Sequence, residues 1–105
     1  MKVITLPLAR QAIRKTARQI KQDFGRQSRD KFLAKVTETR MLLATNPYLG
    51  PIEPLLADLP QTYRSVVVGR LNKMVYHIEE DEKTIYVDDF WDVRREPQAL
   101  ADEVK

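Results

Sequence analysis

The sequence predicts an α+β fold in which a helical hairpin packs on a mostly antiparallel sheet of about four strands. An apolar repeat with helical spacing covers residues 8–45 and is interrupted once, at Gly25. A β-branched run precedes it at residues 2–6, and three strand-like runs follow it within residues 62–95. Because neither helix can bury its apolar side alone, the pair must lie on the sheet.

The size and composition of the chain indicate one ordered domain over residues 1–105. Apolar residues make up 43% and charged residues 31%, which excludes an intrinsically disordered chain. Cysteine is absent, which excludes disulfides, a thiol nucleophile and a cysteine-ligated zinc site. No apolar run approaches the ~20 residues of a membrane span, and no secretory signal begins the chain, so we expect a cytoplasmic protein without membrane contact.

The first helix is expected over residues 7–24. Pro7 suits the first turn, where its missing N–H costs nothing. Gly25 directly follows Phe24 and is typical of the residue that ends a helix. The buried stripe of this helix is expected to contain Ala9, Ile13, Ala17, Ile20 and Phe24.

The other side of the first helix is basic. Its stripe consists of Arg10, Arg14, Arg18 and Lys21, and no acidic residue precedes Asp23. One interpretation is an electrostatic footprint for nucleic acid or for an acidic segment of a partner protein. The other is an ordinary solvated helix face, which is favoured because no aromatic residues are interleaved to stack on bases.

The second helix is expected to begin after Ser28, a suitable N-cap, and to end before Pro47, because the residue before a proline avoids the helical region. With a link of three or four residues, the two helices form an antiparallel hairpin. The buried stripe of the second helix is expected to contain Phe32, Val36, Thr39 and Leu43.

An irregular connector should follow at residues 46–60, which contain four of the six prolines. We expect it to place Leu49, Ile52, Leu55 and Leu56 on the core. Three strands should follow, at residues 63–68, 71–78 and 83–90. Residues 98–104 can form one or two turns of helix.

The first two of these strands are expected to form a hairpin. A two-residue loop would set Val68 opposite Leu71. In that register Arg64, Lys73 and His77 share one face, and the more apolar opposite face lies under the helices. The sequence therefore predicts an open sheet face with three cationic side chains.

The order of these elements carries a resemblance to a known family. It rests on FLAKVTETRMLLATNPYLG at residues 32–50, on YRSVVVGRLNKMVYHIEEDEKTIYV at residues 63–87 and on DVRREP at residues 92–97. Together they resemble the RelE/ParE superfamily of toxins from type II toxin–antitoxin modules, over nearly the whole chain. The resemblance implies a growth inhibitor of the kind that stabilises plasmids, held inactive by a cognate antitoxin, as a homodimer or a heterotetramer with it.

The resemblance also implies a choice between two activities. RelE-like members cut mRNA in the ribosome, whereas ParE-like members poison DNA gyrase and need no catalytic residues. RNA cleavage requires a base, cations around the phosphate and an acid. The resemblance places Arg64, Lys73 and Arg94 at cationic RelE-like positions, but Val66 stands where a second lysine is expected and Leu100 near an expected tyrosine.

His77 is the only histidine and has the pKa range for acid or base catalysis. The RelE-like pattern has no histidine there, which favours an ordinary residue near a strand end. Strand alternation sends Asp88 and Asp89 to opposite faces, so we expect no metal site and no cofactor. Arg95 is a further candidate for contact with a partner or with nucleic acid.

The length of the helices favours the ParE-like branch, because RelE-like members have shorter ones. We therefore expect a type II toxin that inhibits gyrase or a related topoisomerase. The first alternative is a ribosome-dependent ribonuclease with Arg64, Lys73, Arg94 and His77 at its centre. The second is a module without toxicity that binds nucleic acid or protein through the basic stripe.

Overall fold

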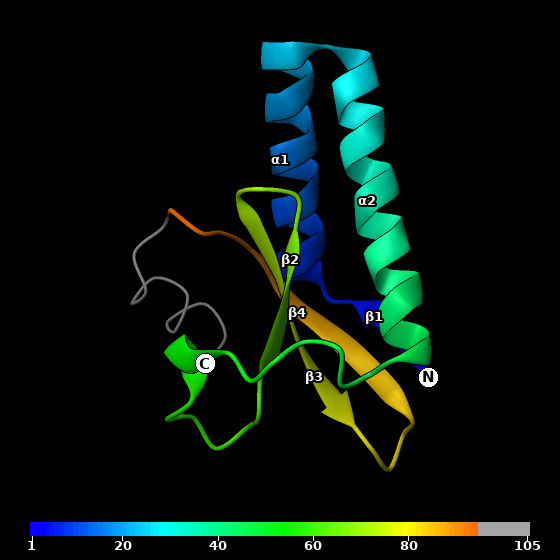
Figure 1. The fold of residues 1–105 in the computed structure, drawn as a ribbon, viewed down its shortest axis with the longest axis vertical. Helices are drawn as coiled ribbons and strands as arrows, with labels where there is room; N and C mark the ends of the chain where they lie inside the picture. The colour runs from blue at the N-terminus through cyan, green and yellow to red at the C-terminus, as the bar shows by residue number, and fades with distance from the viewer. Residues whose placement is uncertain (95–105) are drawn as a thin grey trace.

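A helical hairpin and a four-stranded sheet make up residues 1–94, which are the residues that this computed structural model describes (Figure 1). The predicted α+β fold is confirmed. The helix expected at residues 98–104 lies outside the described residues. In chain order the elements are β1 (Lys2–Thr5), α1 (Pro7–Phe24), α2 (Arg26–Thr45), the 3₁₀ helix η1 (Pro54–Leu56), β2 (Arg64–Val68), β3 (Asn72–Glu79) and β4 (Thr84–Asp92).

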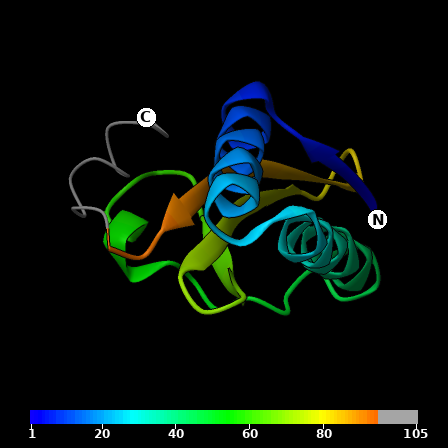
Figure 2. The same ribbon diagram turned by 90° about the horizontal axis from the view of Figure 1, so that it is seen from above.

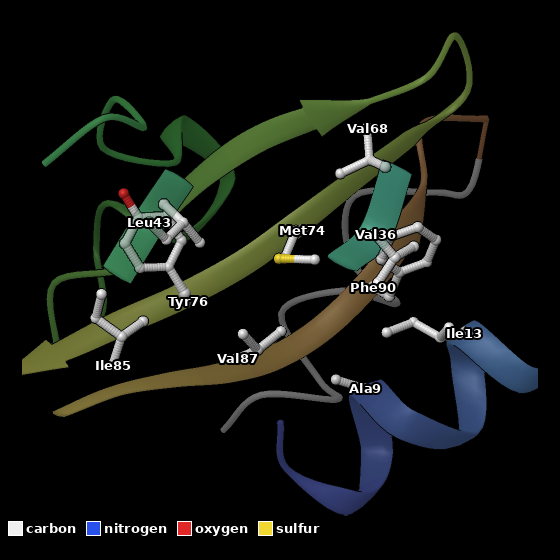
Figure 3. Close-up of a cluster of buried hydrophobic side chains, with 10 residues drawn as sticks. All are labelled: Ala9, Ile13, Val36, Leu43, Val68, Met74, Tyr76, Ile85, Val87 and Phe90. Carbon is white, nitrogen blue, oxygen red and sulfur yellow. The ribbon is translucent and has the colours of Figure 1, made fainter. Parts of the chain in front are cut away.

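The sheet has the strand order β1-β4-β3-β2. β1 runs parallel to β4, and the other two pairs are antiparallel. The two helices stand side by side and antiparallel (Figures 1 and 2). They bury one face of the sheet in a core that Figure 3 shows, formed by Ala9, Ile13, Val36, Leu43, Val68, Met74, Tyr76, Ile85, Val87 and Phe90.

Both predicted helices are present, and their boundary is at Gly25, which has a φ of 94°. Pro7 occupies the first turn of α1, as expected. The predicted N-cap of α2 is wrong: this helix begins at Arg26 and has Gly25 at its N-cap position, so Ser28 lies inside it. No helix within residues 1–94 is both long and apolar enough to span a bilayer.

Phe24 is a second correction to the predicted helices. It was expected in the buried stripe of α1 with Ala17, yet its side chain is 74% exposed. The physical reason is position: the connected end of the hairpin projects beyond the sheet, so the last turn of α1 has nothing to pack on (Figure 1).

The register between β2 and β3 differs from the predicted one by one residue. The loop has three residues, and Val68 pairs with Asn72 instead of Leu71. Gly69 begins this loop with a φ of 69°, a conformation that glycine adopts without strain. This register puts Val66 and Val68 on the same face as Met74 and therefore unites these apolar side chains under the helices.

The register also separates the predicted cations. Arg64 pairs with Tyr76 and belongs to the helix-covered face. Lys73 pairs with Val67 and belongs to the other face, which it shares with His77. The prediction that all three share one face is therefore wrong, because a one-residue shift reverses the facing of a whole strand.

A β-bulge in β4 corrects the prediction for the two aspartates. Val87 pairs with Tyr76 and Asp89 pairs with the adjacent Val75, which leaves Asp88 as the extra residue. The bulge interrupts the alternation of β4. Asp88 contacts His77 and Asp89 lies opposite Val75, so both aspartates are on the face away from the helices.

The connector lies along β2 and covers its outer edge. The backbone N–H of Ser65 donates to the carbonyl of Pro51 at 3.1 Å, and the N–H of Glu53 donates to the carbonyl of Tyr63 at 2.8 Å. Of the four connector residues expected on the core, only Leu56 is buried. It packs with Val75, Trp91, Leu59 and Tyr63 in a second, smaller cluster on the face away from the helices.

Candidate functional site

Arg64 holds the connector against the sheet. Its Nη1 atom donates to the carbonyl of Gly50 at 2.9 Å, and its guanidinium lies 5.0 Å from the ring centroid of Tyr48. The hydroxyl of Tyr76 accepts a hydrogen bond from the N–H of Gly50 at 2.9 Å and donates to the carbonyl of Pro47 at 2.8 Å. The side chain predicted as a catalytic cation thus forms part of a structural anchor.

Lys73 is paired with a buried carboxylate. Its ammonium group binds Glu53, whose side chain is 0% exposed, and lies 4.8 Å from the ring centroid of Trp91. Glu53 also accepts hydrogen bonds from the hydroxyl of Ser65 at 3.3 Å and from the N–H of Leu55 at 3.2 Å. The positive charge of Lys73 is therefore compensated from within the fold.

Arg94 lies exposed in the turn after β4 and binds the carboxylate of Asp92. Its Nε atom donates to Oδ1 at 3.0 Å, and its Nη2 atom donates to Oδ2 at 2.6 Å. These hydrogen bonds raise the pKa of Arg94 above its usual value. The guanidinium is accessible to solvent, but its bidentate face is already occupied by a carboxylate.

His77 lies on β3 between two carboxylates, one from β4 and one from β3 itself. Its Nδ1 atom is 2.7 Å from Oδ2 of Asp88, and its Nε2 atom is 3.3 Å from Oε1 of Glu79. The imidazole stacks on the ring of Tyr86 at 5.3 Å between centroids, and Tyr63 contacts it edge-on. The hydrogen bond to Asp88 and the negative charge of both carboxylates raise the pKa of His77, whereas burial opposes the shift.

This arrangement predicts a pH dependence of stability. The pKa of His77 is raised above 6.5, so its stabilising contribution is complete below that pH and is lost as the pH rises through the folded-state value. We expect the free energy of unfolding to be higher at pH 6 than at pH 8. His77→Gln should remove about 1.5 kcal/mol at pH 6 and much less at pH 8.

Denaturant titrations at both pH values measure this difference. The burial of Asp88 raises the pKa of its carboxyl group above 3.8, and the hydrogen bond with His77 opposes that shift. Lys31→Gln, an exposed substitution on α2, serves as the control. Equal losses at both pH values for His77→Gln would contradict the ion-pair interpretation.

The four predicted catalytic residues do not form one cluster. Arg64 faces the helices, whereas Lys73 and His77 face away from them. Lys73 and His77 are four residues apart on one strand, a distance of about 13 Å. Arg94 lies beyond the far end of β3 from His77, because the N–H of the preceding Val93 donates to the carbonyl of Leu71.

The basic stripe of α1 divides into two parts. Arg10 and Arg14 line a groove of about 370 Å³ between the two helices and β1. Arg10 donates to the outward carbonyl of Thr5 at 3.3 Å, and Arg40 of α2 donates to that of Val3 at 3.2 Å. These contacts place two arginines along the outer edge of β1.

The other part of the stripe, Arg18 and Lys21, continues toward the connected end of the hairpin. Both side chains are exposed, and the exposed Phe24 follows them. Sequence reasoning missed Arg40 and Glu53, because a charged residue within a helix or a connector gives no signal of burial. Arg95 lies outside the described residues, and within residues 1–94 no three acidic or histidine side chains gather as a metal site.

Comparison with known proteins gives one family. The model of the ParE toxin of type II toxin–antitoxin system, parDE, matches residues 3–97. Among curated proteins, none matches the chain.

Proposed function

Because this chain belongs to the family of ParE toxins of type II toxin–antitoxin systems, we propose that it stops growth by inhibiting DNA gyrase or a related topoisomerase. The inhibition works through binding, without catalysis by the toxin itself. The family match supports the toxin class, and the long helical hairpin, with helices of 18 and 20 residues, supports the ParE-like branch.

The observation that carries this proposal is the pairing of the sheet cations with carboxylates. Lys73 binds Glu53, Arg94 binds Asp92 and His77 binds Asp88. A ribonuclease needs cations that are available to a pentacovalent phosphate, together with a base and an acid near it. Carboxylates in those contacts would repel the phosphate, so the geometry favours a toxin that acts by binding.

One observation favours the alternative of a ribosome-dependent ribonuclease. His77 and Lys73 share a sheet face, and the hydrogen bond to Asp88 raises the pKa of His77 above its usual value, which favours the protonated imidazole that a general acid requires. In this alternative Arg64 would contribute only through the anchor of the connector.

As a toxin of a type II system, the protein has a cognate antitoxin as its partner. We place both in the cytoplasm, where gyrase acts, and the proposed inhibition needs no cofactor. A homodimer or a heterotetramer with the antitoxin is the assembly that we propose.

The test uses the purified full chain with gyrase, plasmid DNA and ATP. We expect supercoiling to stop and cleaved gyrase–DNA complexes to accumulate. In a translation extract we expect intact mRNA. The variants His77→Gln and Arg94→Gln should poison gyrase as wild type does, because both side chains are already paired with carboxylates of the fold.

A ribonuclease would give a different result. Loss of a general acid or base slows a reaction by about 100-fold or more. If mRNA is cut and either variant loses cutting to that extent while supercoiling proceeds, the gyrase proposal is wrong.

A further inference from the structure

The connected end of the hairpin combines an exposed aromatic ring with exposed cations. Phe24 ends α1 and is the most exposed of the large apolar side chains within residues 1–94, at 74%. Lys21 lies one turn before it on α1, and Arg26 follows it as the first residue of α2. An apolar ring in this position has no role in the core, and it stands beside exposed cations.

We propose that this end of the hairpin is a surface that binds DNA at an unstacked base. The surface, named here the hairpin tip, consists of Arg18, Lys21, Phe24 and Arg26, together with Arg14, which also lines the groove beside β1 and forms the inner end of the surface. Its cations bind backbone phosphates, and the ring of Phe24 stacks on a base exposed at a gap or a strand break.

The charge pattern of the hairpin tip fits a phosphate backbone. Arg14 to Lys21 span about 10 Å of one helix stripe. One DNA strand carries a phosphate about every 3.4 Å, so this span faces about three of them. Two acidic groups lie nearby: Asp23 accepts a hydrogen bond from Gln19 at 3.0 Å and keeps its charge, and Asp30 pairs with Arg29 at 3.0 Å. The cations of the tip outnumber them, so the surface stays positive.

The exposed ring of Phe24 favours DNA with an unstacked base over a partner that is bound by charge alone. A protein that only screens phosphate charge needs no ring, whereas proteins that hold unpaired strands place aromatic rings beside cations. The interpretation of the basic stripe as a solvated face rested on the lack of such a ring near it, and the exposure of Phe24 supplies one.

This contact goes beyond the proposed inhibition of gyrase, but its role in poisoning rests on that proposed function. Gyrase cleavage produces strand breaks. A tip that stacks on a base at the break would hold the cleaved complex open, whereas intact duplex offers only phosphates to the cations.

The experiment measures the affinity of the full chain for fluorescently labelled DNA without gyrase. Two probes are compared, a continuous duplex and the same duplex with a single-nucleotide gap. We expect tighter binding to the gapped probe and a slope of log affinity against log salt of about −3 to −4. Arg18→Gln/Lys21→Gln should reduce the size of that slope by about 2.

Phe24→Ala separates stacking from charge. It should weaken binding to the gapped probe by about 5- to 100-fold and leave the salt slope unchanged, while Phe24→Tyr retains binding. The matched control is Lys15→Gln/Lys31→Gln, which removes two exposed charges from other helix faces. These exposed substitutions should leave the melting temperature near that of wild type.

Three results would overturn the proposal. The first is an equal loss of DNA affinity in the control. The second is a wild-type affinity in both tip variants. The third is failure of the cognate antitoxin to neutralise the tip variants while DNA binding is unchanged, which assigns the surface to the protein partner.

Gyrase assays on the same variants keep the two proposals distinguishable. If wild type poisons gyrase and the tip variants match it in poisoning and in DNA affinity, the inference fails and the proposed function stands. If DNA binding depends on the tip but the wild-type protein does not inhibit gyrase, the proposed function fails and the inference stands.

Discussion

Glu53→Ala is expected to lower the free energy of unfolding by about 3–5 kcal/mol. The variant removes the partner of Lys73, whose side chain is only 20% exposed, and leaves that charge uncompensated. It also removes the acceptor for the hydroxyl of Ser65 and the N–H of Leu55. Urea denaturation of the purified variant measures the loss.

A double variant tests the physical reason. Glu53→Gln/Lys73→Met removes both charges. With its oxygen in the place of Oε2, the amide still accepts from the N–H of Leu55, and its NH2 group, in the place of Oε1, can donate to the hydroxyl oxygen of Ser65. Replacing a buried pair together costs far less than breaking it, so the double variant should recover most of the stability. A loss below about 1 kcal/mol in Glu53→Ala would show that the pair behaves like an exposed one.

The same double variant bears on function. If Lys73 serves the fold, Glu53→Gln/Lys73→Met should still inhibit growth and poison gyrase. A folded double variant without toxicity would restore Lys73 as a functional residue and would count against the proposed mode of action.

The helices and the order of the strands could be predicted because their signals are local. Pro7 and Gly25 limit α1, and the apolar repeat defines both helices. Packing is not local: the repeat of α1 places Phe24 on the buried side, yet nothing covers that turn, because the sheet ends before it. A periodic pattern tells which side of a helix is apolar and not how far its support extends.

The candidate site was harder to predict because it depends on register. One extra loop residue at Leu71 moved Arg64 to the face opposite Lys73, and one bulge residue, Asp88, brought a carboxylate to His77. Strand alternation carries no signal for either event. The apolar pattern did contain a clue, because only the observed register unites Val66 with Met74.

Gly50→Ala is expected to destabilise the protein by about 2–3 kcal/mol or more, although it adds a single methyl group. A Cβ atom at Gly50 would lie 2.9 Å from the carbonyl carbon of Ser65 and 2.9 Å from Cγ1 of Val66, both on the neighbouring strand β2. It would lie closer still to the carbonyl oxygen of Ser65. Backbone atoms cannot yield as a flexible side chain can. The connector would have to move away from the edge of β2.

That movement would also break the anchor around Gly50. Arg64 binds its carbonyl and Tyr76 binds its N–H, so both side chains lose a partner when the connector shifts. Gly69→Ala is the matched control: its Cβ meets nothing within 4 Å, and only its φ of 69° is strained. We expect a loss of about 1 kcal/mol there.

Thermal and urea unfolding of the two variants compare steric clash with backbone strain. If Gly50→Ala loses no more stability than Gly69→Ala, the connector adapts easily, and Arg64 is then not fixed by the fold. If the larger loss is found, Arg64 is held at Gly50 by packing that the rest of the sheet requires. A side chain fixed in this way serves the scaffold and is not free to contact a target.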